Sequence, residues 1–164
     1  MSTNKKTPQV IELTEDDAEA IEQLFKEVWP YATEYPEEWR KNRMLSKDKI
    51  IDEMRHGYHY FGIKVEEFDN KLAGLYKALI TPEGCFGEHQ SINPKYARKG
   101  MGGAMYKQFI EFAKKMGCKR NYCNILIGQL PSEKLVTKFG FKKVGEPYEQ
   151  AKGMFVQMYE REVE

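Results

Sequence analysis

The sequence predicts an α/β domain built on a mixed, mostly antiparallel sheet flanked by helices, and two observations carry this prediction. Residues 58–93 hold three runs of alternating apolar residues separated by the turn sequences FDNK and TPEG, which is typical of an antiparallel meander. A glycine-rich segment, an amphipathic stretch and another apolar run follow, which predicts one right-handed βαβ crossover. The expected order of elements is β-α-α-β-β-β-α-β-α-β-β.

The N-terminal third supplies the first strand and the first helices. VIELT, at residues 10–14, is expected to be a strand, and Thr14 with Asp17 three residues later forms a capping-box variant that starts a helix. Apolar residues at helical spacing follow until Pro30. Residues 31–57 are expected to be a broken helical region, which is the second helical element of the chain and ends at Gly57.

The C-terminal half alternates between helix and strand. Apolar residues from Met101 to Met116 recur at helical spacing, and Gly117 ends that helix. NYCNILIG is expected to be a strand, SEKLVTKF a short helix ended by Gly140, and FKKVG and MFVQMYERE the last two strands.

Composition limits the function classes. A length of 164 residues with 41% hydrophobic and 31% charged residues indicates one soluble domain spanning residues 1–164, with short polar tails. Lys plus Arg number 26 against 25 for Asp plus Glu, so no broad basic face is expected, and neither a nucleic-acid partner nor a membrane is. Cys85, Cys118 and Cys123 are expected to be reduced thiols in the cytoplasm, and no metal site is expected because the histidines lack metal-site spacing.

The segment INPKYARKGMGGAMYKQF, residues 92–109, needs a physical explanation. Gly100, Gly102 and Gly103 lie at the start of a helix, where each glycine costs about 1 kcal/mol relative to alanine. A strand, a glycine turn and a helix start together form an anion site, because the first N–H groups and the helix dipole favour negative charge.

Arg98 and Lys99 add positive charge beside this turn, so a diphosphate is the ligand that we expect. The spacing fits neither a Walker loop nor a Rossmann fingerprint. The alternative interpretation is a flexible or tightly packed helix start with no ligand.

INPKYARKGMGGAMYKQFIEFAKKMGCK followed by SEKLVTKFGFKKVG resembles the GNAT superfamily of N-acetyltransferases. The family signature Gln/Arg-x-x-Gly-x-Gly/Ala falls on residues 97–102, and its late Lys-Leu-Gly-Phe falls on residues 138–141. The likeness extends from Val10 to Val163 and is strongest over residues 86–144. It implies a GNAT-like fold and transfer of an acetyl group from acetyl-CoA to a primary amine, of a small molecule or a peptide, in a ternary complex.

The resemblance also implies which residues bind the cofactor. The pyrophosphate would be held by backbone amides of Arg98, Lys99, Gly100, Met101, Gly102 and Gly103. The pantetheine arm would add as a pseudo-strand along the backbone of Gln90, Ser91 and Ile92, and the thioester would lie where this strand and NYCNILIG splay apart. Gln129 replaces the family's cofactor-contacting asparagine.

Glu88 is the candidate general base, because a carboxylate in a central strand is costly without a partner or a role. The alternative is a structural glutamate that is paired to a lysine or caps a loop, and His89 is the reserve base. Alternation in an unbroken strand places Glu88, Gln90 and Ile92 on one face and His89 and Ser91 on the other, unless a bulge intervenes. A backbone N–H of this strand would polarise the thioester carbonyl.

The family's frequent general-acid tyrosine falls on Val136, which cannot donate a proton. Tyr148 and Tyr159, near the last hairpin, are the alternative acids, although packing is the more common role of a tyrosine in a chain that has ten of them. Cys123 has no His–Asp partners, so a covalent acyl-enzyme is not expected.

The acceptor site is expected between VWPYATEYPEEWRKNR and the last hairpin loop, GEPYEQAKG. Aromatic residues and three glutamates of the first segment could form a mouth for a cationic amine: Trp29, Tyr31, Tyr35, Trp39, Glu34, Glu37 and Glu38. The alternative is a helix pair with buried aromatic and solvated acidic side chains.

Two other function classes remain open. One is a non-catalytic acyl-CoA sensor or assembly module, which the valine at position 136 would suit. The other, a nucleoside-phosphate or nucleic-acid binder, is disfavoured by the balanced charge. A homodimer is compatible with the apolar last strand.

Overall fold

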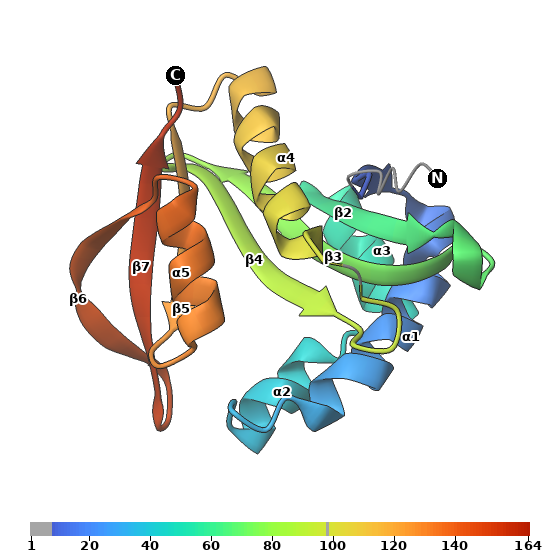
Figure 1. Ribbon diagram of the computed structural model, residues 1–164. Coiled ribbons are helices and arrows are strands. Elements are labelled where there is room, and N and C mark those ends of the chain that lie inside the picture. The colour runs from blue at the N-terminus through green and yellow to red at the C-terminus, as the bar shows by residue number, and fades with distance from the viewer. Residues whose placement is uncertain (1–7, 98) are drawn as a thin grey trace, which may run out of the picture.

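A mixed sheet forms the centre of the chain, as the sequence predicts (Figure 1). The computed structural model describes residues 8–97 and 99–164, and these residues form seven strands and five α-helices. The strands are β1 (Ile11–Leu13), β2 (Tyr58–Val65), β3 (Lys71–Thr81), β4 (Gly84–Ile92), β5 (Arg120–Leu126), β6 (Lys142–Ala151) and β7 (Met154–Glu162). The helices are α1 (Ala18–Val28), α2 (Glu37–Arg43), α3 (Lys47–Arg55), α4 (Met101–Lys115) and α5 (Leu130–Lys138).

The strands lie in the order β1-β2-β3-β4-β5-β7-β6. Every neighbouring pair is antiparallel except β4 and β5, which are parallel and are joined through α4. The meander and the single parallel crossover are therefore both confirmed, and β4 lies at the middle of the sheet.

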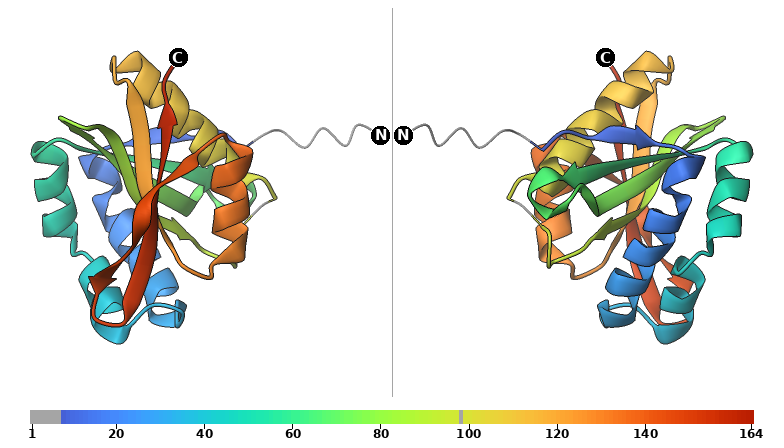
Figure 2. Two further views of the ribbon diagram at one scale, coloured as in Figure 1. Left: turned by 90° about the vertical axis from the view of Figure 1, so that its left-hand side faces the viewer. Right: turned by 90° about the vertical axis from the view of Figure 1, so that its right-hand side faces the viewer.

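Helices cover both faces of the sheet (Figures 1 and 2). Helices α4 and α5 pack on one face, where Met105, Phe109 and Val136 belong to one apolar core. Helices α1 and α3 pack on the other face, where Phe25 and Ile50 belong to a second core. The two cores hold the middle strands from both sides, which fixes the backbone of β4.

Local signals start the helices of the N-terminal third. The Thr14 N–H donates to the Asp17 carboxylate at 2.8 Å, as the capping-box pattern predicts. The expected broken helical region is two separate helices, α2 and α3, and the Ser46 side chain caps α3 by accepting the Lys49 N–H at 3.2 Å.

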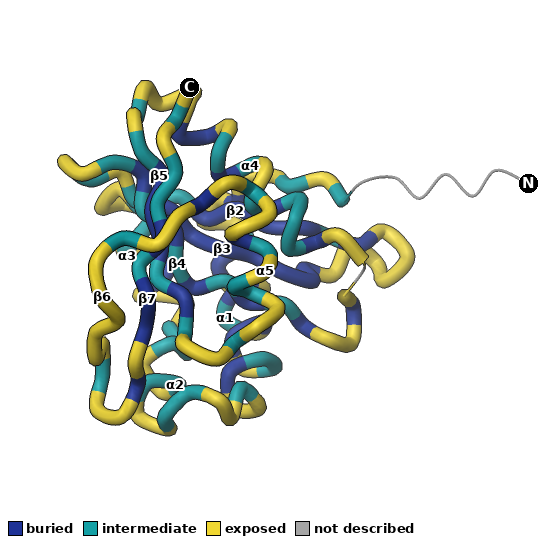
Figure 3. Tube along the Cα trace, turned by 60° about the vertical axis from the view of Figure 1, so that its left-hand side comes forward, coloured by how far each residue is buried: buried dark blue, intermediate teal, exposed yellow. Residues whose placement is uncertain are grey.

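The last hairpin differs from the prediction. GEPYEQAKG was expected to be a loop, but β6 continues through most of it to Ala151. The strand can continue because β6 is the edge of the sheet, where Pro147 breaks no interior ladder. The buried Gln157 amide bonds the Val144 and Gly145 carbonyls at 3.1 and 3.2 Å, which supports the irregular stretch. Figure 3 shows that β6 is exposed along most of its length.

Candidate functional site

The two parallel strands separate at the centre of the sheet. They pair only where residues 85–87 of β4 face residues 121–123 of β5. Beyond this point β4 runs on to Ile92 and β5 to Leu126, each hydrogen-bonded only on its outer side. The sequence-based expectation of a splay between these strands is therefore met.

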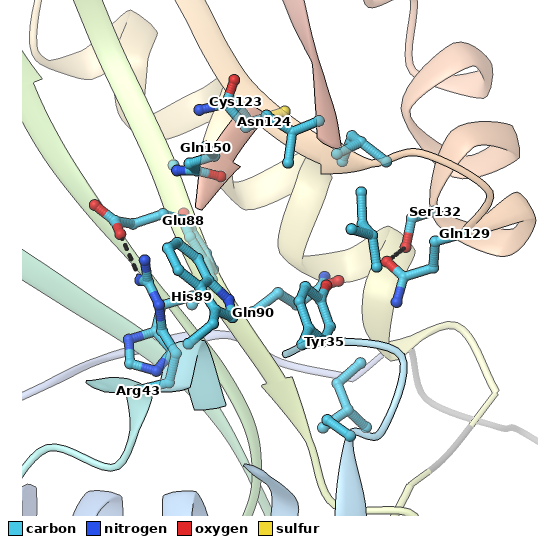
Figure 4. A pocket seen from close by; sticks show the side chains of 18 of the residues that line it. Tyr35, Arg43, Glu88, His89, Gln90, Cys123, Asn124, Gln129, Ser132 and Gln150 are labelled. Atoms are coloured by element: carbon cyan, nitrogen blue, oxygen red, sulfur yellow. Dashed lines mark hydrogen bonds and ion pairs between the residues drawn. The ribbon is translucent and has the colours of Figure 1, made fainter. Parts of the chain in front are cut away.

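A pocket of about 270 Å³ occupies the splay (Figure 4). It is bounded by β4 and β5, by α4 and α5 on one side, and by α1 and the chain around α2 on the other. Its charged and amide-bearing residues come from six different segments: Glu34, Arg43, Glu88, Gln90, Asn124, Gln129 and Gln150. The remaining lining is mainly apolar and aromatic, as is typical of small-ligand sites.

A β-bulge in β4 changes the predicted faces of this strand. Lys77 of β3 pairs with Glu88, but Leu75, two residues earlier, pairs with Ser91, so β4 carries one extra residue. His89 absorbs the bulge with a φ of 64°, which is uncommon for a residue other than glycine. The prediction that Glu88 and Gln90 share a face is wrong, because the bulge breaks the alternation between them.

Glu88 and His89 instead both face the α1–α2 side of the sheet. The Glu88 side chain is 22% exposed and accepts a hydrogen bond from Arg43 Nη1 at 2.8 Å, with the Arg43 side chain 17% exposed. The Arg43 guanidinium lies 3.9 Å from the centre of the Trp39 ring, which fixes its position. Glu88 is thus both paired and pocket-lining, and its partner is an arginine rather than the lysine considered above.

His89 is buried and stacks on Phe25, with ring centres 4.3 Å apart and an interplanar angle of 4°. Within the described chain, neither ring nitrogen makes a hydrogen bond of ordinary geometry. Burial lowers the pKa of His89 well below 6.5, and the positive charges of Lys77 and Arg43 lower it further, although the Arg43 backbone opposes part of the shift. His89 is therefore neutral at neutral pH.

This neutral histidine predicts a loss of stability in mild acid. The unfolded chain takes up a proton below about pH 6.5 and the folded chain does not, so the free energy of unfolding falls as the pH falls. We expect His89 to contribute a loss of up to about 2 kcal/mol between about pH 7 and pH 5. Chemical denaturation of the wild type and His89→Asn, a residue that tolerates the backbone conformation, measures this contribution. The exposed His56→Gln is the control, and equal pH slopes for wild type and His89→Asn would contradict the assignment.

The other predicted residues of β4 divide between the two faces. The Ser91 hydroxyl accepts from Trp29 Nε1 at 2.9 Å and donates to the His89 carbonyl at 3.0 Å, so its side chain supports α1. Gln90 and Ile92 lie on the α4 side and line the pocket. Gln90, Ser91 and Ile92 can all present backbone groups to a ligand on the edge of β4 that faces away from β3.

The glycine segment forms the start of α4. Gly100 precedes the helix with a φ of 88°, and its carbonyl accepts the first intrahelical bond, from Ala104, at 2.9 Å. A Cβ on Gly102 would lie 2.9 Å from Leu135 Cδ2 of α5, so close helix packing also favours glycine there. The packing interpretation therefore applies at Gly102, and the anion site stays a prediction. Lys99 is exposed beside the turn, and Arg98 lies outside the described residues.

The profile of the acetyltransferase (GNAT) family matches residues 18–141, which is most of the chain. The chain belongs to the GNAT acetyltransferase family. A comparison with curated proteins finds no significant sequence match.

Solved structures share the fold of this GNAT chain at low sequence identity. The PaiA N-acetyltransferase of Thermoplasma acidophilum, in complex with coenzyme A, has 20% identity and a TM-score of 0.73 over 93% of this chain and 98% of its own. YncA of Salmonella typhimurium, a putative acetyltransferase with its cofactor acetyl-CoA, has 13% identity and a TM-score of 0.75 over 97% and 95%. The ribosomal-protein-S18-alanine N-acetyltransferase of Escherichia coli has 14% identity and a TM-score of 0.72 over 94% and 93%.

Gln129 lies at the start of α5 of this GNAT domain and lines the pocket. Its side-chain oxygen accepts the Ser132 hydroxyl at 2.8 Å, as the dashed line in Figure 4 shows. Burial raises the pKa of Tyr35, and a hydrogen bond between its hydroxyl and the Gln129 side chain offsets part of this rise. The amide is therefore placed at the pocket, between α5 and the segment before α2.

None of the three positions considered from sequence for a proton donor lies at the pocket. Val136 is 0% exposed and belongs to the core beneath α5. Tyr159 is buried in the same core, and Tyr148 lies on the exposed strand β6. Neither tyrosine lines the pocket. Burial raises the pKa of Cys123 to about 12, which agrees with the expectation that it is no nucleophile.

Arg43, Tyr106 and Asn124 line the pocket and were not named from sequence. Arg43 is 45 positions from its partner Glu88, and the run WRKNR holds three other candidate cations or amides. Tyr106 fits the helical pattern of α4, where an aromatic residue signals packing. In the described chain the tyrosines that line the pocket are Tyr35, Tyr76 and Tyr106.

The acidic mouth is smaller than predicted. Glu37 and Glu38 point into solvent and pair with Lys41 at 3.7 Å, and only Glu34 of the three glutamates lines the pocket. The aromatic residues Trp29, Tyr35 and Trp39 do line it, whereas Tyr31 is 79% exposed. The solvated-acid interpretation is thus correct for two of the glutamates.

Two further findings concern the described residues alone. No group of three or more His, Cys, Asp or Glu side chains there could hold a metal ion. None of the helices in that part of the chain has the length and apolar character needed to cross a bilayer.

Proposed function

We propose that the chain transfers an acetyl group from acetyl-CoA to a primary amine, of a small molecule or a protein, by direct attack in a ternary complex. The observation that carries this proposal is the splay between β4 and β5, which opens a pocket beside the glycine-rich start of α4. Coenzyme A in the PaiA structure and acetyl-CoA in the YncA structure, both of this fold, support the choice of donor.

The start of α4 suits a pyrophosphate. The backbone N–H groups of Gly102 and Gly103 precede the first intrahelical bond, and neither residue has a side chain of its own. The unpaired side of β4 from Gln90 to Ile92 suits an extended pantetheine arm, which would add main-chain hydrogen bonds there. The bulge at His89 leaves one backbone position outside the β3 ladder, where an N–H could polarise the thioester carbonyl.

Glu88 is the proposed base. Its carboxylate would accept a proton from the attacking amine, directly or through water, while Arg43 holds the side chain in place at 2.8 Å. The uncharged His89, which stacks on Phe25 and meets Trp29 edge-on, is the weaker candidate, because its lowered pKa makes it a poor base. The amine nitrogen forms the new bond to the carbonyl carbon, the carbon–sulfur bond breaks, and the sulfur leaves with a proton as CoA.

A non-catalytic acyl-CoA sensor is the second candidate. Val136, which is fully buried, stands where the resemblance puts the general-acid tyrosine. A sensor would bind acetyl-CoA without converting it to CoA, so a turnover measurement distinguishes the two candidates.

A thermal melt with acetyl-CoA, CoA and ATP in parallel tests the donor site. At about one hundred times its dissociation constant, a ligand adds roughly 2.7 kcal/mol of stability, which shifts the midpoint of a domain of this size by about 5–10 °C. We expect this shift with both CoA species and none with ATP. Thiol release from acetyl-CoA over a panel of amines then tests for transfer. The absence of a melting shift with both acetyl-CoA and CoA would contradict the proposal.

A further inference from the structure

The leaving sulfur needs a proton, and the residue at position 136 cannot supply one. Val136 is aliphatic and belongs to the core shared by α4, α5 and β7. Another hydroxyl would have to reach the point where β4 and β5 separate, since the thioester is proposed to lie there.

Tyr106 places a hydroxyl at that point. It lies on α4, one turn after Gly102 and on the same face of the helix, and it lines the pocket. Its hydroxyl lies against the Cys123 thiol. Cys123 and Gly87 form the last parallel pair before the strands separate, so the hydroxyl is at the closed end of the splay.

The ring of Tyr106 is held by the segment that carries Val136. It stacks on Phe139 at 5.9 Å and meets Phe141 edge-on at 5.7 Å. Phe139 follows Val136 by three residues, which is about one helical turn. Tyr106 therefore lies on α4 next to the last turn of α5. This turn carries residue 136, the position of the family's tyrosine.

The other two pocket tyrosines are placed differently. The Tyr76 hydroxyl donates to the Gln108 side chain and is committed to that partner. The Tyr35 hydroxyl has the Gln129 side chain, at the start of α5, as its hydrogen-bond partner. Tyr106 is the pocket tyrosine whose neighbour is a weakly hydrogen-bonding thiol, so a second sulfur can compete for its proton.

We propose that Tyr106 is the catalytic residue that hydrogen-bonds and protonates the departing CoA sulfur, in the role that the resemblance gives to position 136. This inference rests on the proposed acetyl transfer. As the carbon–sulfur bond breaks, the electron pair moves to sulfur and the Tyr106 proton follows it. The proton that Glu88 takes from the amine then restores the phenol through water, so the sum is amine plus thioester giving amide plus thiol.

Ionisation of bound CoA tests this role without an acceptor amine. The ultraviolet absorbance of the thiolate is titrated in the complex with CoA, and the complex with desulfo-CoA is subtracted to remove protein tyrosines and cysteines. A hydroxyl that donates to sulfur stabilises the thiolate, so in Tyr106→Phe we expect the thiol–thiolate equilibrium to shift about tenfold or more toward the thiol.

Tyr106→Phe keeps the ring and removes only the hydroxyl, and Tyr148→Phe, outside the pocket, is the matched control. The CoA-induced melting shift of each variant verifies that it folds and binds. With an acceptor from the amine panel, kcat of Tyr106→Phe should fall roughly a hundredfold or more while KM for acetyl-CoA changes little.

The outcomes are distinguishable. If wild type binds CoA and transfers acetyl groups but Tyr106→Phe ionises CoA and turns over like wild type, the role of Tyr106 is wrong and the proposed function stands. If wild type shows no CoA-induced shift, the proposed function fails and the inference fails with it.

Discussion

Replacing Glu88 by glutamine should lower kcat by roughly a hundredfold or more, because the amide cannot accept the proton that the attacking amine must lose. The change keeps the shape of the side chain, and its amide oxygen can still accept the Arg43 Nη1 hydrogen bond seen at 2.8 Å. CoA binding should therefore persist, since Glu88 lies away from the glycine turn. The measurement is thiol release from acetyl-CoA as a function of pH, and the acid limb that a carboxylate base imposes should disappear in the variant.

Glu34→Gln is the matched control, because Glu34 is a second glutamate on the pocket wall. It should leave turnover within a small factor of wild type. If Glu88→Gln and Glu34→Gln turn over alike, the carboxylate of Glu88 is a structural partner of Arg43 and takes no part in proton transfer. A drop in CoA-induced stabilisation alongside the loss of activity would indicate a disturbed pocket instead.

The features predicted correctly from sequence are those that local patterns determine. The turns FDNK and TPEG separate three alternating runs, so the meander follows from strand period and turn chemistry. Gly100, Gly102 and Gly103 mark the start of α4, and the splay between β4 and β5 was expected from the resemblance to GNAT proteins. The element order and the place of β4 at the centre of the sheet follow from the same signals.

The features that were missed depend on contacts between distant segments. The bulge sits on His89, where no glycine signals a left-handed residue, and burial between α1 and β4 holds that backbone in place. The faces assigned to Glu88 and Gln90 failed for that reason alone. Arg43 and Tyr106 acquire their positions only when α2 and α4 pack against β4 and β5. Neither residue differs in its local sequence from an ordinary helix position.

Replacing Gly103 by aspartate should abolish CoA binding while leaving the fold as stable as wild type or slightly more so. Gly103 is the third residue of α4, and a Cβ there would lie 3.6 Å from the Phe139 ring, an ordinary contact. A carboxylate in the first turn interacts favourably with the helix dipole by about 0.3–1 kcal/mol, and loss of the glycine favours the helix further. The same charge would repel a pyrophosphate at this turn by up to about 4 kcal/mol per charge pair at close range.

Gly103→Ala separates charge from bulk, because it adds the same Cβ without the carboxylate. We expect Gly103→Ala to keep the CoA-induced melting shift, and Gly103→Asp to lose at least about a hundredfold in affinity, which removes the shift at the same CoA concentration. The opposite signs for stability and binding matter here, since a damaged fold would lower both. If Gly103→Asp binds CoA as wild type does, the pyrophosphate does not lie at the start of α4, and the glycines serve only the close packing of α4 against α5.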